Sequence, residues 1–214
     1  MPQLEIKLLG SFDVTLDGQP LQEFRSDKVR GLLAYLVIEH NRPLRRAHLV
    51  DLLWNGYTQA TALNSLAKSL TNLRRLLSGI ACLNITRHTV EFDAAADGVW
   101  CDALVFADAL QGCQQHGHPN LTRCISCRNR LQQAATLYRG EFLRGLSTHD
   151  EQPFDLWREK MQIHFQGIAD AMQRILQTPQ TPPRHNLPRS FNQFFGREQE
   201  IAALKAALST IRFS

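Results

Sequence analysis

The sequence predicts an α+β fold in which a small antiparallel sheet is followed by helices, a hairpin and a second, all-helical part. Three observations support it: apolar and polar residues alternate at the start of the chain, leucines recur at helical spacing over 26–77, and helical periodicity returns over about 101–176. Of the 214 residues, 43% are hydrophobic and 21% are charged, which is typical of a folded protein. A chain of this length forms one large domain or two small ones.

The first predicted domain, residues 1–95, begins with short strands. Apolar and polar residues alternate over 4–16, and Asp17 and Gly18 then form a strong turn signal. Residues 19–24 return as a third strand. A small antiparallel sheet therefore precedes the first helix.

The rest of this domain is predicted to hold three helices and a hairpin. One helix extends from Ser26, its N-cap, to about Glu39, and a short helix ends near Asn55. A longer helix follows over 58–77, and two short strands over 83–93 form a hairpin. Helix, turn, helix, helix and hairpin after a small sheet is the order of a winged helix.

The second predicted domain, residues 100–178, is all-helical because its apolar residues recur at helical spacing. Four of the nine prolines then fall at positions 179, 182, 183 and 188, which is typical of a linker and places one over 179–190. An ordered pattern resumes over 191–214 and stops with the sequence. We therefore expect the start of a truncated third domain there.

The composition argues against membrane, exported and disulfide-bonded proteins. The longest apolar run, residues 31–38, is far shorter than the roughly 18 residues of a membrane helix. The N-terminus lacks the pattern of a signal peptide, and the cysteines are odd in number, five. No Ser/His/Asp or Cys/His/Asn arrangement has local support, so we expect a cytoplasmic protein that is not an enzyme.

Positive charge is concentrated in one segment of the chain. Residues 41–89 carry a net charge of +6, whereas the whole chain carries +4 and the remainder therefore −2. On the helix over 58–77, the predicted inner face consists of Leu63, Leu66, Leu70, Leu73 and Leu77. Counting about 100° per residue, the outward side carries Thr61, Asn64, Lys68, Thr71, Asn72 and Arg75, with Arg74 at the flank.

This outward side has cationic and hydrogen-bonding residues but no carboxylate, which is typical of a helix that lies between two rows of DNA phosphates. A merely solvated helix is the alternative, but such helices usually mix Glu and Lys. Lys68, Thr71, Asn72 and Arg75 are the candidates for base edges, with Asn64 beside them. Contacts to the DNA backbone are predicted for Arg42, Arg45, Arg46, Arg87 and His88.

A cluster of cysteines and histidines has the spacing C-x2-H-x-H-x5-C-x2-C and consists of Cys113, His116, His118, Cys124 and Cys127. Thiolates and imidazoles at such spacing are the ligands of a structural zinc ion. A redox pair of Cys124 and Cys127, or cysteines that only fill space, are the alternatives. Cys82 and Cys101 are expected in the core.

Several motifs in order match one known family: LEIKLLGSFDVTLDGQPL, FRSDKVRGLLAYLV, LVDLLW, LTNLRRLL, TVEFD, LYRGEFLRGL and FDLWREK. Over residues 4–176 the chain resembles the Streptomyces antibiotic regulatory protein (SARP) type of transcriptional activator. The resemblance implies an OmpR-type winged helix and a tetratricopeptide-like bacterial transcriptional activation domain. It also implies double-stranded DNA and RNA polymerase as partners, with a homodimer or tandem pair of copies on repeated promoter sites. Ala67 departs from the family, which often has Arg there, and this implies a different sequence preference.

The tail NLPRSFNQFFGREQEIAALKAAL, residues 186–208, resembles the entry to a STAND-type (NB-ARC-like) NTPase domain. The sequence contains no G-x-x-x-x-G-K-[ST] phosphate-binding loop, so we expect no bound nucleotide in these residues. The prediction is thus a DNA-binding transcriptional regulator, an activator. The alternative is a protein-interaction adaptor built on tetratricopeptide-like helices, with a winged helix that no longer binds DNA.

Overall fold

The computed structural model describes residues 3–40, 42–117, 120–148 and 152–178. All of them belong to one compact unit that ends at Thr178. The predicted linker over 179–190 and the predicted start of an NTPase domain over 191–214 lie outside the described residues, and so does His118.

The first sheet has four strands in the order β3-β2-β1-β7, with bounds Gln19–Pro20, Asp13–Leu16, Leu4–Lys7 and Val99–Cys101. The turn that joins β2 to β3 consists of Asp17 and Gly18, with φ of 53° and 75°. A tight two-residue hairpin turn requires such positive values. The parallel strand β7 makes the sheet mixed rather than purely antiparallel. Its three residues are too few for the sequence pattern to predict.

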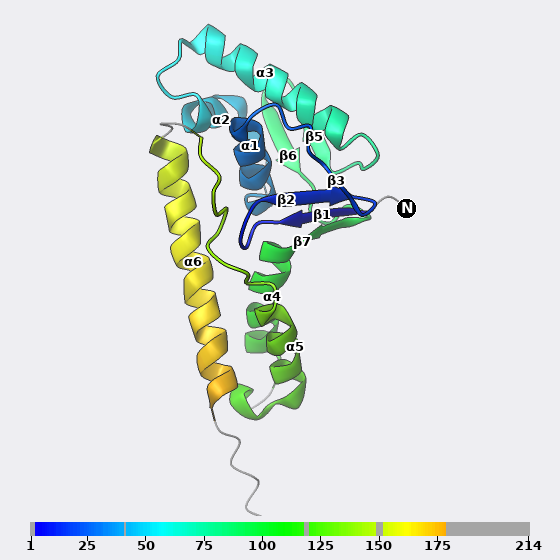
Figure 1. Ribbon diagram of the computed structural model, residues 1–214, viewed down its shortest axis with the longest axis vertical. Coiled ribbons are helices and arrows are strands. Elements are labelled where there is room, and N and C mark those ends of the chain that lie inside the picture. Colours follow the sequence, from blue (N-terminus) through cyan, green and yellow to red (C-terminus); the bar gives the residue numbers. More distant parts are fainter. Residues whose placement is uncertain (1–2, 41, 118–119, 149–151, 179–214) are drawn as a thin grey trace, which may run out of the picture. The chain divides into compact units, whose positions relative to one another are not determined.

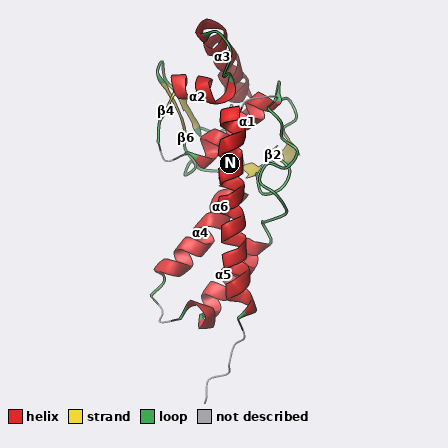
Figure 2. Cartoon of the chain, turned by 90° about the vertical axis from the view of Figure 1, so that its left-hand side faces the viewer, coloured by secondary structure: helices red, strands yellow, loops and turns green. Residues whose placement is uncertain are grey.

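The winged helix consists of three helices and a second sheet. The helices are α1 (Asp27–Ile38), α2 (Arg46–Leu53) and α3 (Gln59–Leu76). The sheet has the order β4-β6-β5, with bounds Leu44–Arg45, Thr89–Phe92 and Leu83–Ile85. Figure 2 shows α2, α3 and this sheet together toward the upper end, and α4 and α5 at the lower end. The predicted order of helices and hairpin is confirmed.

The second part of the unit contains α4 (Asp102–Gln115), the short 3-10 helix η1 (Leu121–Arg123), α5 (Ile125–Ala135) and α6 (Gln152–Gln177). Residues 136–148 differ from the all-helical prediction. They form no helix and instead run beside the first sheet, where Phe142 pairs with Leu9 and Arg144 with Ser11. The backbone of this segment forms its hydrogen bonds with residues 8–10, which connect β1 to β2, and helical periodicity does not reveal this pairing.

Asp102 joins three segments at the start of α4. It is 1% exposed, and its carboxylate accepts hydrogen bonds from the backbone N–H groups of Leu8 and Leu9, at 2.7 and 3.2 Å. The guanidinium of Arg139 donates to the same carboxylate at 2.7 Å. Burial raises the pKa of Asp102, although these partners act to lower it. One side chain therefore ties β1, α4 and the segment after α5 together.

The long helix α6 connects the second part to the winged helix (Figure 1). Near its start Trp157 meets the Tyr35 ring of α1, with centroids 4.8 Å apart, and Phe154 is fully buried against α1. The buried apolar residues of both parts make one continuous core. At 26 residues α6 is the longest helix, yet no helix among the described residues is long and apolar enough to cross a membrane.

Cys82 and Cys101 lie in the core as predicted, at 0% and 3% exposure. Burial raises the pKa of Cys82 to about 11 and that of Cys101 to about 12. Both thiols therefore keep their protons in the folded chain at pH values where the unfolded chain has lost them. The free energy of unfolding should accordingly fall as the pH rises above about 9, by up to about 1.4 kcal/mol per pH unit for each thiol.

Urea unfolding of the chain and of Cys82→Ala, measured from about pH 8 to about pH 11, checks this expectation. The variant should show the shallower decline with pH, because it has lost one of the two protonated thiols. If the free energy of unfolding fell equally steeply with pH in both proteins, burial would not raise the pKa of the Cys82 thiol.

Candidate nucleic-acid interface

Helix α3 packs on α1 and α2 with one side and presents the other to solvent. It begins after Thr58, whose hydroxyl oxygen accepts a hydrogen bond from the backbone N–H of Thr61 at 3.4 Å. The buried side consists of Ala62, Leu66, Ser69, Leu70, Asn72, Leu73 and Leu76. Figure 1 shows α3 at the edge of the described unit, with no other element on its far side.

Polar and basic side chains cover the solvent side of α3. Five exposed residues at spacings of three and four make up what we call the α3 outer face: Thr61, Asn64, Lys68, Thr71 and Arg75. Arg74 is exposed next to them, and no residue of α3 is acidic. This surface therefore offers donors and positive charge without a carboxylate of its own to repel a polyanion.

Leu63 does not belong to the inner face, contrary to the prediction. Its side chain is 40% exposed, whereas Ala62 is fully buried. The buried side is turned toward Ala62, Ser69 and Leu76, because that is where α1 and α2 lie. The leucine spacing alone therefore predicted a buried face that was rotated about the helix axis toward Leu63 and away from Ala62.

Asn72 is the second correction, because the sequence predicted it on the outward side. It is 2% exposed. Its amide nitrogen donates to the carbonyl oxygen of Glu23 at 3.2 Å, and its amide oxygen accepts from the backbone N–H of Arg25 at 3.1 Å. Asn72 thus holds the segment before α1 against α3 and is not available to a base edge. Its place near Ser69 and Leu76, at helical spacings of three and four, was the signal that could have indicated burial.

This segment adds two charged residues to the interface that the sequence analysis did not include. Glu23 accepts a hydrogen bond from the guanidinium of Arg75 at 2.6 Å, and both side chains remain more than half exposed, at 70% and 57%. Ion pairs this exposed contribute little to stability. Arg25 is exposed and is held beside α3 through Asn72. No local pattern marks either residue, since they reach α3 only through the fold.

The basic residues predicted for backbone contacts lie in two places. Arg42 follows α1 and its guanidinium donates to Glu39 at 2.7 Å. The others gather at the end of the β4-β6-β5 sheet, where Arg45 pairs with Thr89 and the backbone N–H of Arg46 donates to the carbonyl oxygen of His88 at 2.9 Å. Exposed at this end are Arg45, Arg87 and His88, whereas Arg46 is half-buried.

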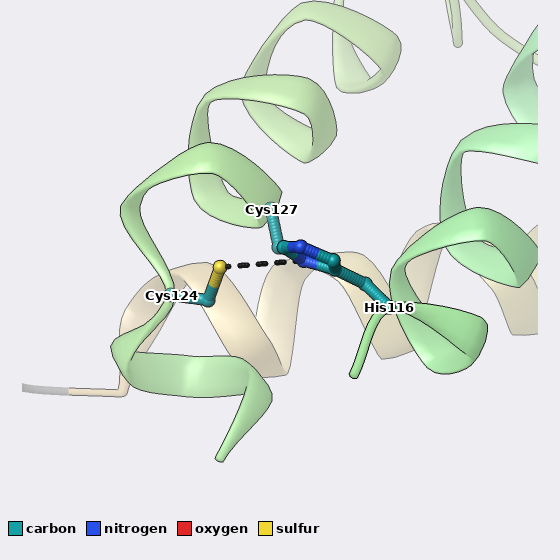
Figure 3. A group of neighbouring side chains, drawn as sticks. All are labelled: His116, Cys124 and Cys127. Carbon is teal, nitrogen blue, oxygen red and sulfur yellow. Dashed lines mark hydrogen bonds between the residues drawn. The ribbon is translucent and has the colours of Figure 1, made fainter. Parts of the chain in front are cut away.

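The second candidate site lies where α4 ends and α5 begins. There the ligand atoms of His116, Cys124 and Cys127 all lie within 4.8 Å of one another. Figure 3 shows the His116 ring, from the end of α4, pointing at the two cysteines at the start of α5. Cys113, one turn earlier on α4, is buried, and its thiol lies 3.7 Å from the carbonyl oxygen of Cys127. The structure thus brings three of the five predicted ligands together and places Cys113 beside them.

The two cysteines of α5 differ in acidity. Backbone N–H groups of Cys127 and Ser126, at the first turn of the helix, act to lower the pKa of the Cys124 thiol, and its pKa lies below the ordinary value. Burial raises the pKa of Cys127, and the neighbouring thiols of Cys113 and Cys124 raise it further. In the metal-free chain, Cys124 is therefore the more acidic thiol.

The described elements define a winged helix that is followed by packed helices and exposes a basic helix. No family model matches the chain. The chain is homologous to the transcriptional regulatory protein EmbR, as 77 residues, 36% of this chain, are 38% identical to EmbR of Mycobacterium bovis and of Mycobacterium tuberculosis. That match covers 20% of each relative, so the chain spans about a fifth of the length of the curated relatives it matches.

A solved structure shows the same fold. Mycobacterium tuberculosis EmbR, in complex with a low affinity phosphopeptide, matches 82% of this chain with a TM-score of 0.61 and 24% sequence identity. The match covers 46% of that chain. It confirms the α+β prediction, and the homology to a transcriptional regulatory protein agrees with the resemblance to SARP-type regulators.

Proposed function

We propose that this chain binds double-stranded DNA through α3 as part of a transcriptional regulator. The observation that carries the proposal is the α3 outer face, whose donors and cations are exposed on a helix without acidic residues. The homology to EmbR, a transcriptional regulatory protein, supports the same conclusion. The chain acts by binding in the cytoplasm rather than by catalysis.

In this proposal α3 lies in a major groove of the DNA. Asn64, Lys68 and Thr71 point away from α1 and α2 and contact base edges, since amide, ammonium and hydroxyl groups all pair there. Arg45, Arg87 and Arg74 contact phosphates and position the helix. Arg75 contacts either a base edge or a phosphate once its ion pair with Glu23 has broken.

The finer parts of the proposal rest on the resemblance to SARP-type regulators. The chain binds directly repeated promoter sites as a homodimer or tandem pair, and it activates transcription through contacts with RNA polymerase. The helices α4, α5 and α6 act as the tetratricopeptide-like activation domain.

Selection of genomic fragments by the purified 214-residue chain tests DNA binding directly. The captured fragments should share a repeated sequence motif, and capture should weaken steeply with salt because bound phosphates release counterions. Capture without a motif would indicate only a basic surface. No capture at low salt would favour a protein-interaction adaptor and overturn the proposal.

Glu23→Gln should strengthen DNA binding several-fold at low salt. The substitution removes a carboxylate that repels phosphates and frees Arg75 from its 2.6 Å contact. Fluorescence anisotropy on a selected site measures the change, with Glu159→Gln on α6 as the control for the loss of one exposed negative charge. An unchanged or weaker affinity for Glu23→Gln would place Arg75 and Glu23 outside the DNA contact.

A further inference from the structure

We propose that Cys113, His116, Cys124 and Cys127 bind one structural zinc ion that joins the end of α4 to the start of α5. The proposal rests on the geometry of the side chains and does not depend on DNA binding. Three cysteines and one histidine are a common ligand set of structural zinc sites.

Two separations between ligand atoms already match those around a tetrahedral ion. With Zn–S bonds of about 2.3 Å and Zn–N bonds of about 2.0 Å, sulfur and nitrogen ligands of one ion lie about 3.5 Å apart. Nδ1 of His116 lies 3.3 Å from Sγ of Cys127 and 3.6 Å from Sγ of Cys124. The same nitrogen thus lies at about the separation from both sulfurs that a shared zinc ion would give.

Cys113 supplies the fourth ligand. It lies in the last turn of α4, three residues before His116, which directly follows the helix. Its thiol contacts the backbone of Cys127, the residue whose sulfur already faces His116. Two ligands therefore come from the end of α4, Cys113 in its last turn and His116 directly after it. Cys124, directly before α5, and Cys127, in its first turn, complete the set, and two residues separate the members of each pair.

The charges around the cluster suit a bound cation with thiolate ligands. On binding zinc, the three thiols release their protons to solvent and His116 coordinates as neutral imidazole, so the site carries a net charge of −1. No described acidic side chain takes part in the cluster. Arg130, one turn into α5, lies close enough to stabilise negative charge on Cys124.

Zinc here would stabilise the end of the unit that lies away from α3. Arg128, next to Cys127, donates hydrogen bonds to the carbonyl oxygens of Ile175 and Leu176, at 3.0 and 2.8 Å. Its cation thus caps the C-terminal turn of α6. A metal that fixes the first turn of α5 therefore also fixes the last turn of α6.

Metal analysis of the purified 214-residue chain, produced with added Zn²⁺ under reducing conditions, is the first test. We expect one zinc per chain. Cys113→Ser, Cys124→Ser and Cys127→Ser should each weaken the affinity for zinc, measured by competition with a chelator, by at least about tenfold, since loss of a second-shell partner alone weakens metal binding this much. Cys82→Ala, which removes a buried cysteine of the core, is the matched control and should retain the metal.

Three outcomes would overturn the proposal. They are an unmodified chain without zinc, a disulfide between Cys124 and Cys127 in its place, and loss of zinc in His118→Ala with retention in Cys113→Ser. None of the three bears on α3, so DNA binding can fail or succeed independently.

Hydrogen exchange before and after chelation tests the structural role. Without zinc, amides in the last turn of α4, the first turn of α5 and the last turn of α6 should exchange at least about tenfold faster, while those of α3 keep their rates. Unchanged exchange at the α4–α5 junction would contradict a structural role for the metal. Visible absorption of the Co²⁺-loaded chain provides a further readout, because tetrahedral thiolate ligation gives intense bands.

Discussion

The double variant Lys68→Ala/Arg75→Ala should bind a selected DNA site at least about 30-fold more weakly than the unmodified chain at equal salt, since each good base contact contributes about 1–3 kcal/mol and two contribute at least about 2 kcal/mol. Both side chains are exposed on the α3 outer face. Their removal leaves the fold intact, so the loss should appear in binding and not in the free energy of unfolding.

Affinities measured over a range of salt concentrations separate the two roles of these residues. If both contact phosphates, the slope of log K against log salt becomes shallower by about 2, because each lost phosphate contact removes about 0.9 from it. If Lys68 reads a base, the variant also loses discrimination between the selected motif and a scrambled sequence.

Lys160→Ala/Arg174→Ala is the matched control for this experiment. It removes one lysine and one arginine that are exposed on α6, so the net charge changes equally. It should retain most of the affinity for the selected site. Equal losses in both double variants would mean that overall charge, and not α3, determines binding.

Phe154→Ala should lower the free energy of unfolding by about 3–5 kcal/mol, because it removes a fully buried aromatic side chain and leaves a cavity. The Phe154 ring lies 5.3 Å from the Trp157 ring and packs so closely on α1 that a Cβ at Gly31 would lie 3.0 Å from it. The contact joins the start of α6 to the winged helix. Its loss should therefore destabilise both parts of the unit together.

Leu156→Ala provides the control for this substitution. Leu156 is on the same helix two residues further on, and its side chain is 52% exposed. Truncation there should change the free energy of unfolding by less than about 1 kcal/mol. Urea unfolding followed by far-UV circular dichroism measures both variants. Similar values for the two, or a first transition that spares the winged helix in Phe154→Ala, would show that α6 does not support α1.

The different burial of Phe154 and Leu156 shows what sequence patterns can and cannot predict. Helical periodicity predicted α6 and its apolar residues, because a helix buries one side and the spacing marks that side. It did not predict which end of α6 packs on the winged helix. That depends on Tyr35 and Gly31 of α1, more than a hundred residues earlier in the chain.

The proposed zinc ligands also show which features follow from the sequence pattern and which follow only from packing. The spacing of the cysteines predicted a metal site, because two residues between ligands let both reach one ion from a single turn. Only the packing of α4 on α5 showed that the His116 ring faces both Cys124 and Cys127.

The sequence by itself determined the winged-helix order, the approximate spans of α1 and α3 and the exposure of Asn64, Lys68 and Thr71, because these follow from local turns and helical spacing. The tertiary structure alone decided the burial of Asn72, the pairing of Arg75 with Glu23 and the parallel strand β7. Periodicity specifies which residues share a side of a helix. The flank of that side is covered by segments distant along the chain, and only their packing decides whether a polar residue there meets solvent or a buried backbone.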